Sequence, residues 1–88
     1  MEPQELIGAE VEVVEAANPS LRGLAGRVVD ETMRTLLVEA ARGERPRRVP
    51  KAGCRFRFRW PGGRTVEMDG RGLVGRPEES RVYIRPEG

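Results

Sequence analysis

The chain has 88 residues, enough for one compact domain but too few for two. Apolar residues make up 38% of it and aromatic residues only 5%, so the core must be built mainly from Val, Leu, Ile and Ala. The net charge is +2, histidine is absent, the lone cysteine is Cys54, and no apolar run approaches the roughly 18 residues of a membrane span, which excludes internal disulfides, zinc sites of the usual ligand set and a spanning helix.

Short alternating patterns dominate the first half of the chain. Residues 9–16 alternate Glu with Val and predict a strand that ends at an Asn-Pro-Ser turn. Residues 23–30 predict a second strand, bent by a bulge near Gly23 and Gly26. A turn over residues 30–34 then leads into a third strand, 35–40, which we expect to form a hairpin with the second.

The second half opens with a polar turn at residues 42–45 and a short strand through Arg48 and Val49, which Pro50 must either interrupt or place at an edge. Residues 55–60 (RFRFRW) alternate strictly, which puts arginines on one face of a strand and aromatics on the other. A glycine-containing loop joins this strand to a partner at 65–69. Beyond it we expect a short strand at Leu73 and Val74, a short helix starting at Pro77, and, at the N-terminus, a helical turn over 3–7.

These elements place the chain in the mainly β class. About six short strands with glycines at the bends predict a small, strongly bent antiparallel β-barrel in which one sheet closes on itself, with short or absent terminal helices. We expect one domain over residues 1–88, with 1–8 and 77–88 peripheral. Without a membrane span or signal peptide pattern, a cytoplasmic location is expected.

The charges are unevenly distributed along the sequence. Residues 1–31 carry a net charge of −5, whereas residues 42–64 hold nine basic residues against Glu44 alone, a net charge of +8. All basic residues except Lys51 are arginine, whose planar fork of donors suits phosphate and can stack on bases. The basic segment therefore predicts a nucleic-acid surface.

The strand at 55–60 offers two interpretations for each of its faces. Arg55, Arg57 and Arg59 form a row with steps of about 6.6 Å, suited to backbone phosphates; alternatively, Glu67 and Asp69 on the next strand pair with them. Phe56 and Phe58 either stack bases or, as we favour, fill the core. The sequence leaves open whether Trp60 is core or stacks on a base.

No catalytic site is expected. Cys54 has no histidine partner and shares the alternation of its strand, so we interpret it as a packing residue. The acidic pairs Asp30–Glu31 and Glu67–Asp69 fit turn capping and a charged strand face better than a magnesium site. No metal or cofactor is expected to be bound by this chain.

An ordered set of motifs resembles the archaeal ribonuclease P protein component 1 family. The resemblance runs from Glu5 to about Glu79. It rests on Glu5-Leu6-Ile7-Gly8, Val11-Glu12-Val13-Val14, Asn18-Pro19-Ser20-Leu21, Val28-Val29-Asp30-Glu31-Thr32, Thr35-Leu36, Val49-Pro50-Lys51-Ala52-Gly53-Cys54, Phe56, Phe58 and Gly75-Arg76-Pro77-Glu78.

The resemblance implies an Sm-like barrel and a non-catalytic role. In this family the ribonuclease P RNA removes the 5′ leader of precursor tRNA with magnesium, and protein subunits support it. The implied partners are that RNA, a zinc-ribbon protein subunit, other ribonuclease P protein subunits and, indirectly, precursor tRNA. Where relatives often continue into a lysine-rich helix, residues 81–86 here suggest an extended segment.

Candidate residues follow from the basic segment and the matched motifs together. The residues expected to bind RNA are Asn18, Ser20, Arg22, Arg47, Arg48, Lys51, Arg55, Arg57 and Arg76. Those expected to contact a protein partner are Leu6, Ile7 and Leu21. The alternative function is an Sm-like or ribosome-associated barrel acting mainly as a protein-assembly module, and a nuclease in its own right is the least favoured.

Overall fold

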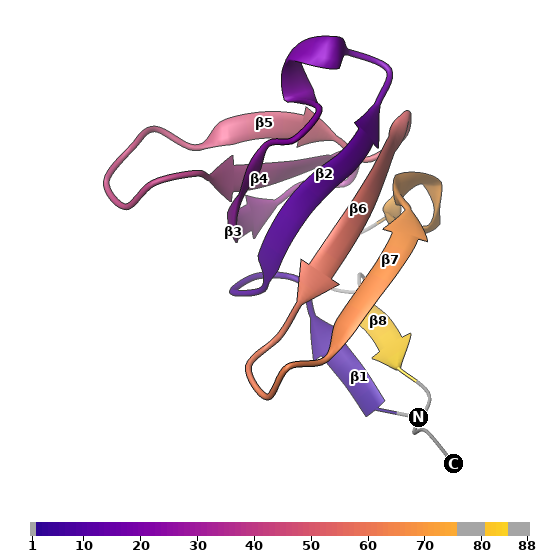
Figure 1. Cartoon of the computed structure of the whole chain (residues 1–88). Helices are drawn as coiled ribbons and strands as arrows, with labels where there is room; N and C mark the ends of the chain where they lie inside the picture. The colour runs from indigo at the N-terminus through magenta and orange to yellow at the C-terminus, as the bar shows by residue number, and fades with distance from the viewer. Residues whose placement is uncertain (1, 76–80, 85–88) are drawn as a thin grey trace.

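The computed structural model describes residues 2–75 and 81–84. Within them lie eight short strands and two turns of 3-10 helix (Figure 1). Their bounds are β1 Glu2–Glu5, β2 Glu10–Ala16, η1 Pro19–Leu21, β3 Ala25–Glu31, β4 Thr35–Glu39, β5 Arg47–Pro50, β6 Cys54–Arg59, β7 Thr65–Asp69, η2 Gly70–Leu73 and β8 Arg81–Ile84. No helix in the described segments is long and apolar enough to cross a bilayer.

Six strands form one antiparallel sheet in the order β5-β4-β3-β2-β6-β7. Hairpins join β3 to β4, β4 to β5 and β6 to β7, while β6 returns to pair along the length of β2. The sheet curves so strongly that β4 and β5 run across the direction of β6 and β7 (Figure 1). The predicted fold class, a small bent antiparallel β-barrel, is confirmed.

Two bulges and one glycine produce the bend. The register of β2 against β6 shifts between Val13 and Glu15, and that of β3 against β4 between Val28 and Asp30, so the bulge in β3 lies downstream of the glycines at which it was expected. Gly26 instead permits a close approach, because a Cβ there would lie 2.2 Å from the carbonyl oxygen of Glu39.

The two edge strands of the sheet, β5 and β7, do not pair with each other. The segment after β7 spans the gap between them. A Cβ on Gly70 would lie 1.8 Å from the carbonyl oxygen of Lys51, and the amide of Gly75 donates to the carbonyl of Met33 over 3.0 Å. The prediction that one sheet closes on itself is therefore wrong: backbone packing at this corner bridges the two edges, and no strand ladder joins them.

The inward side chains of the strands make a core of mainly aliphatic residues, as the composition predicts. Phe56 and Phe58 are fully buried with ring centroids 5.6 Å apart, and Trp60 lies 5.9 Å from Phe58. Trp60 is 6% exposed, and its Nε1 donates to the carbonyl of Glu5 over 2.8 Å. Trp60 is thus a core residue that also holds the end of β1, and it has no face available for a base.

Two expectations about the chain ends and connections are wrong, and a third is confirmed. Residues 2–5 form strand β1 instead of a helical turn, because they pair with β8, which lies 76 or more residues away in sequence. Leu73 ends the 3-10 turn η2, whose N-cap is Asp69, and is not in a strand. The extended segment expected at 81–86 is present as β8 over 81–84. The helix start expected at Pro77 lies outside the described residues.

Candidate nucleic-acid interface

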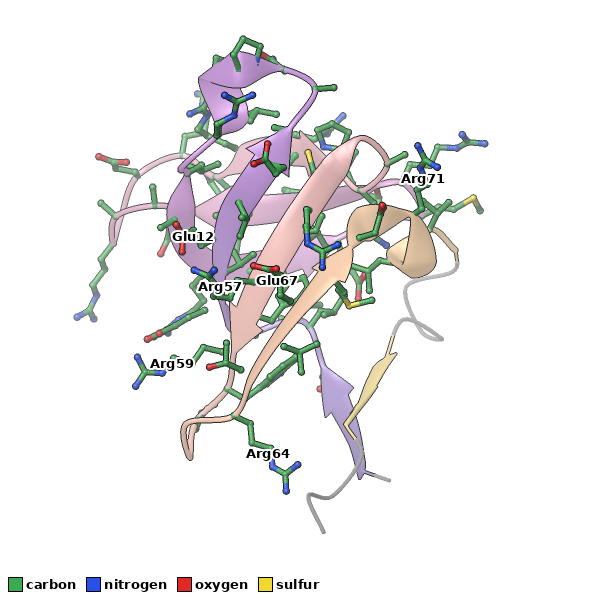
Figure 2. All side chains as sticks on the ribbon, turned by 45° about the vertical axis from the view of Figure 1, so that its right-hand side comes forward. Glu12, Arg57, Arg59, Arg64, Glu67 and Arg71 are labelled. Carbon is green, nitrogen blue, oxygen red and sulfur yellow. The ribbon has the colours of Figure 1, made fainter. Side chains whose placement is uncertain are left out.

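The strict alternation of β6 separates its two kinds of side chain as predicted. Phe56 and Phe58 are buried, whereas Arg55, Arg57 and Arg59 are exposed on the outer face of the barrel. Figure 2 shows Arg57 and Arg59 following each other along this face. The row of arginines therefore exists, and its neighbours decide what it can bind.

Carboxylates face the row from both sides. On β2, Glu15, Glu12 and Glu10 stand directly opposite Arg55, Arg57 and Arg59. On β7, Asp69 and Glu67 stand opposite Arg55 and Arg57. The outer face of these three strands consequently presents more acidic than basic side chains.

Two of the three arginines make short ion pairs. Arg57 reaches Glu12 and Glu67 through its two terminal nitrogens, each over 3.1 Å (Figure 2). Arg55 Nε donates to Glu67 Oε2 over 3.2 Å. Because Arg55 donates this hydrogen bond and both guanidinium charges lie nearby, the pKa of Glu67 lies below its ordinary value. The ion-paired interpretation is confirmed for Glu67, whereas Asp69 makes no ion pair with an arginine of residues 2–75. RNA contact by Arg55 and Arg57 stays a prediction.

Unpaired guanidinium groups lie elsewhere. Arg42, Arg45, Arg47 and Arg48 sit on the β4–β5 hairpin, all exposed and none within ion-pair distance of a described carboxylate. We call these four residues the hairpin arginines. The remaining arginines without such a pair in residues 2–75 are Arg27, Arg34, Arg59, Arg64 and Arg71.

An open groove of about 1170 Å³ runs between the β4–β5 hairpin and the outer face. Ala25 and Gly26 line it, where small side chains leave space. Charged groups of both signs complete the lining: Arg27, Arg42, Arg57, Arg59, Glu10, Glu12 and Glu39. Of the four hairpin arginines, Arg42 alone lines this groove.

The candidates on the β2–β3 loop are exposed and partly engaged. Asn18 Oδ1 accepts from the amide and the hydroxyl of Ser20 over 3.0 and 2.9 Å, which caps η1. Arg22 Nε lies 3.9 Å from Glu15. Asn18 and Ser20 thus shape this loop, and their contact with RNA stays a prediction. Arg76 lies outside the described residues.

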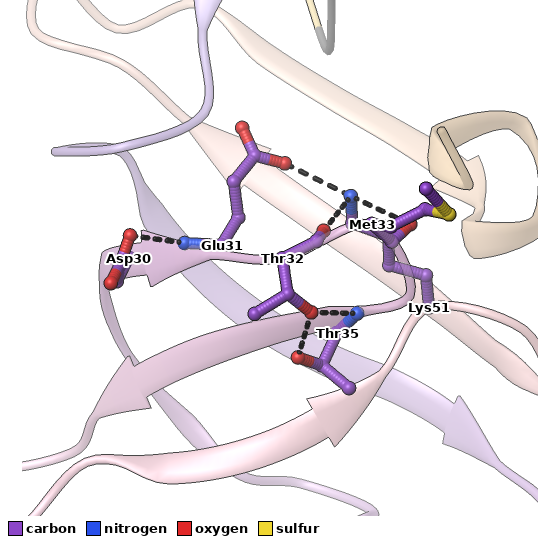
Figure 3. A network of polar contacts seen from close by, with 6 residues as sticks. All are labelled: Asp30, Glu31, Thr32, Met33, Thr35 and Lys51. Atoms are coloured by element: carbon purple, nitrogen blue, oxygen red, sulfur yellow. Dashed lines mark hydrogen bonds and ion pairs between the residues drawn. The ribbon is translucent and has the colours of Figure 1, made fainter. Parts of the chain in front are cut away.

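Lys51 is the clearest correction to the predicted site. Its side chain is 0% exposed, and Nζ donates to the carbonyls of Thr32 and Met33 over 2.8 and 3.4 Å (Figure 3). Nζ also lies 3.0 Å from Glu31 Oε2, which is itself buried and accepts no hydrogen bond of good geometry. Lys51 therefore holds the β3–β4 turn from inside the barrel and presents no charge to a surface ligand.

Two of the three residues expected to contact a protein partner are also corrected. Leu6 and Leu21 are buried in the core, because the N-terminal turn and η1 fold their apolar side chains inward. Ile7 is 50% exposed and remains available. Of the predicted apolar contact surface, only Ile7 lies on the outside.

Several exposed arginines were not among the sequence candidates. Arg42 and Arg45 lie in a turn whose only acid is Glu44, a signal that the sequence does contain. The lack of ion pairs at Arg34 and Arg71 depends on tertiary neighbours, and no local pattern indicates it.

Comparison with known proteins identifies relatives along most of the chain. Residues 1–82 match the family model described as ribonuclease P/MRP, subunit p29. The ribonuclease P protein component 1 of Methanothermobacter thermautotrophicus is 49% identical over 75 residues, covering 85% of this chain and 80% of that protein. The same component of Methanocaldococcus jannaschii is also 49% identical over 75 residues, covering 85% and 77%.

A solved structure agrees with the fold. The structure of Mth11, described as a homologue of human RNase P protein Rpp29, is 47% identical and superposes with a TM-score of 0.66, covering 86% of this chain and 96% of Mth11. The bent barrel, the matched family model and these relatives together show that the chain belongs to the ribonuclease P/MRP p29 family, as an archaeal-type ribonuclease P protein component 1.

Proposed function

We propose that this protein binds the ribonuclease P RNA as an accessory subunit and supports removal of the 5′ leader from precursor tRNA. The chain contributes no catalytic group; magnesium is used by the RNA. Its partners are that RNA, a zinc-ribbon ribonuclease P protein subunit, other ribonuclease P protein subunits and, indirectly, precursor tRNA, in the cytoplasm. Family membership supports the assignment to the ribonucleoprotein.

The observation that carries RNA binding is the group of hairpin arginines. Four exposed guanidinium groups lie within seven consecutive residues, 42–48, and none is held by a described carboxylate. An unpaired guanidinium gains its full Coulomb and hydrogen-bond energy from a phosphate, whereas Arg57 must first give up Glu12 and Glu67. The hairpin is therefore the primary RNA-binding element of this proposal.

Reconstitution with the ribonuclease P RNA tests the proposal. The protein is expected to lower the magnesium concentration that half-maximal cleavage of precursor tRNA requires. Its basic side chains neutralise some of the RNA phosphates, so fewer magnesium ions are needed as counterions. Replacing the hairpin arginines by glutamine should abolish most of this effect. A protein that leaves the magnesium requirement unchanged at saturating concentration contradicts the proposed function.

A further inference from the structure

Three segments meet at the corner that completes the barrel: the β3–β4 turn, the residue after β5, and η2 with the residues that follow it. The amide of Lys51 donates to the carbonyl of Arg34 over 2.8 Å, and the amide of Gly75 donates to the carbonyl of Met33 over 3.0 Å. Gly70 packs directly on the backbone of Lys51. These contacts hold Met33 against Gly75, Arg34 against Lys51, and the start of η2 against Lys51.

The buried lysine holds this corner from inside. Nζ of Lys51 has three oxygen neighbours, the carbonyls of Thr32 and Met33 and a carboxylate oxygen of Glu31 (Figure 3). Thr35 adds a hydrogen bond from its amide to Thr32 Oγ1 over 3.1 Å. The backbone of the turn is thus held on both sides, so the side chains it projects outward have a fixed base.

The outward side chains combine apolar surface with free positive charge. Met33 and Val74 are 50% and 43% exposed, two of the three large exposed apolar residues in the described chain. Arg34 and Arg71 are exposed and pair with no described carboxylate. Asp69, the acid nearest to Arg71 in sequence, caps η2 by accepting a hydrogen bond from the amide of Arg71 over 2.9 Å. We call Met33, Arg34, Arg71 and Val74 the η2 corner.

We infer that the η2 corner binds an unpaired nucleotide of the RNA, which rests on the proposed function. Aliphatic side chains gain nothing against the phosphates that a duplex presents, but they can cover the face of a base that is not stacked in a helix. Arg34 and Arg71 take the phosphates on either side, or stack on the base through their planar groups. This contact lies apart from the hairpin arginines and differs from them in requiring single-stranded RNA.

Paired variants test the inference. Arg34→Gln with Arg71→Gln removes the charge, and Met33→Ser with Val74→Ser removes the apolar surface. Arg71→Gln is also made alone, and Arg64→Gln is its matched single-charge control, since Figure 2 shows Arg64 and Arg71 near opposite ends of β7. Ile7→Ser is the apolar control, as the third exposed apolar residue. Thermal unfolding establishes that each variant is folded.

Affinity is measured for the ribonuclease P RNA, for a short single-stranded oligoribonucleotide and for the same sequence closed in a duplex. We expect the apolar pair to weaken single-strand binding about tenfold and to leave duplex binding unchanged. The arginine pair should also lower the log–log salt slope by about 1.4 for the single strand. The two controls should stay within about twofold of the parent protein for the single strand, since neither lies at the corner.

A second measurement does not depend on affinity. Met33→Cys, labelled with a thiol-directed photocrosslinker while Cys54 stays buried, should crosslink to loop or bulge nucleotides of the ribonuclease P RNA. Crosslinks confined to helical segments, or none, overturn the inference.

The outcomes separate the two proposals. If the parent protein binds none of these RNAs, the proposed function fails. If it binds and the corner variants equal their controls, or lose single-strand and duplex binding equally, only the inference about the corner fails. Variants that keep RNA affinity but no longer retain another protein subunit in the reconstituted holoenzyme identify a protein-docking face instead, which also overturns it.

Discussion

At the residue scale, the burial of Lys51 is a feature that the sequence alone did not predict. A lysine in a basic segment reads as surface charge, yet this one is fully buried against Glu31, 20 residues earlier in the chain. Charge counts describe composition along the sequence, whereas burial depends on which strands cross. The same limit applies to Leu6 and Leu21, whose apolar character predicts either a core or an interface.

Replacing Lys51 by methionine is expected to destabilise the protein by about 3–5 kcal/mol, because Glu31 is left buried without its counter-charge. The double variant Lys51→Met with Glu31→Leu should recover part of that loss, since no uncompensated charge remains although the carbonyls of Thr32 and Met33 lose their donor. Urea unfolding of both variants measures the difference. If the single variant Lys51→Met is as stable as the parent protein, the Lys51–Glu31 pair does not contribute to the free energy of unfolding.

Gly70 has a matched neighbour that makes a sharp comparison. A Cβ at Gly70 would lie 1.8 Å from the Lys51 carbonyl oxygen, whereas the nearest atom to a Cβ at Gly72 is the flexible end of Met68 at 3.5 Å. We expect Gly70→Ala to cost about 1–3 kcal/mol or more in unfolding free energy and Gly72→Ala to stay within about 0.5 kcal/mol. Equal effects in thermal or urea unfolding would contradict the packing at this corner.

At the element scale, two-residue alternation predicted the strands well. The pattern of residues 55–60 gave both the strand and the orientation of its two faces, because a pleated strand reverses its side chains at every residue. The expected strand at Leu73 and Val74 was wrong because Asp69 caps a 3-10 turn there. The β1–β8 pair escaped prediction because it joins the two ends of the chain.

The ion pairing of the outer face could not be predicted from the sequence of β6 alone. The basic row is offset by acids on β2, 40 or more residues away in sequence, and that register exists only in the folded sheet. Glu67 on β7 was considered as a partner from the start, since a hairpin makes it local.

Removing Glu67 tests how far the outer face is neutralised. Glu67→Gln frees Arg55 and one side of Arg57, and should raise RNA affinity about two- to threefold at low salt. Glu5→Gln is the control, removing the same charge at a position where Glu5 makes no ion pair with an arginine of residues 2–75. An equal increase in both variants would indicate net charge alone.

The stability of the same variant should depend on pH in one direction. Because the folded-state pKa of Glu67 is lowered, its ion pairs contribute fully above the ordinary carboxyl pKa, and the contribution is lost as the pH falls through the lowered value. The difference in unfolding free energy between the parent protein and Glu67→Gln should therefore be constant near neutral pH and shrink in acid. A difference that grows on acidification would have the wrong sign.

At the scale of the whole molecule, the open edges of the sheet bear on the alternative function. An assembly module of the Sm-like kind would use β5 or β7 to pair with another copy. β5 is only four residues long, begins with two arginines and ends at Pro50, features that protect an edge. We expect a monomer by light scattering without RNA, and a ring-sized oligomer would favour the assembly module.

The central claim is that the unpaired arginines on the β4–β5 hairpin contribute more to binding of the ribonuclease P RNA than the ion-paired arginines on β6 do. The most direct test compares Arg42, Arg45, Arg47 and Arg48 replaced together by glutamine with Arg55→Gln plus Arg57→Gln, in RNA affinity across a salt series. The hairpin variant should lose affinity steeply and lower the log–log salt slope by about 3, while the β6 variant should change the slope by less than about 1. The reverse order, with the β6 variant losing more affinity and slope than the hairpin variant, would contradict the account.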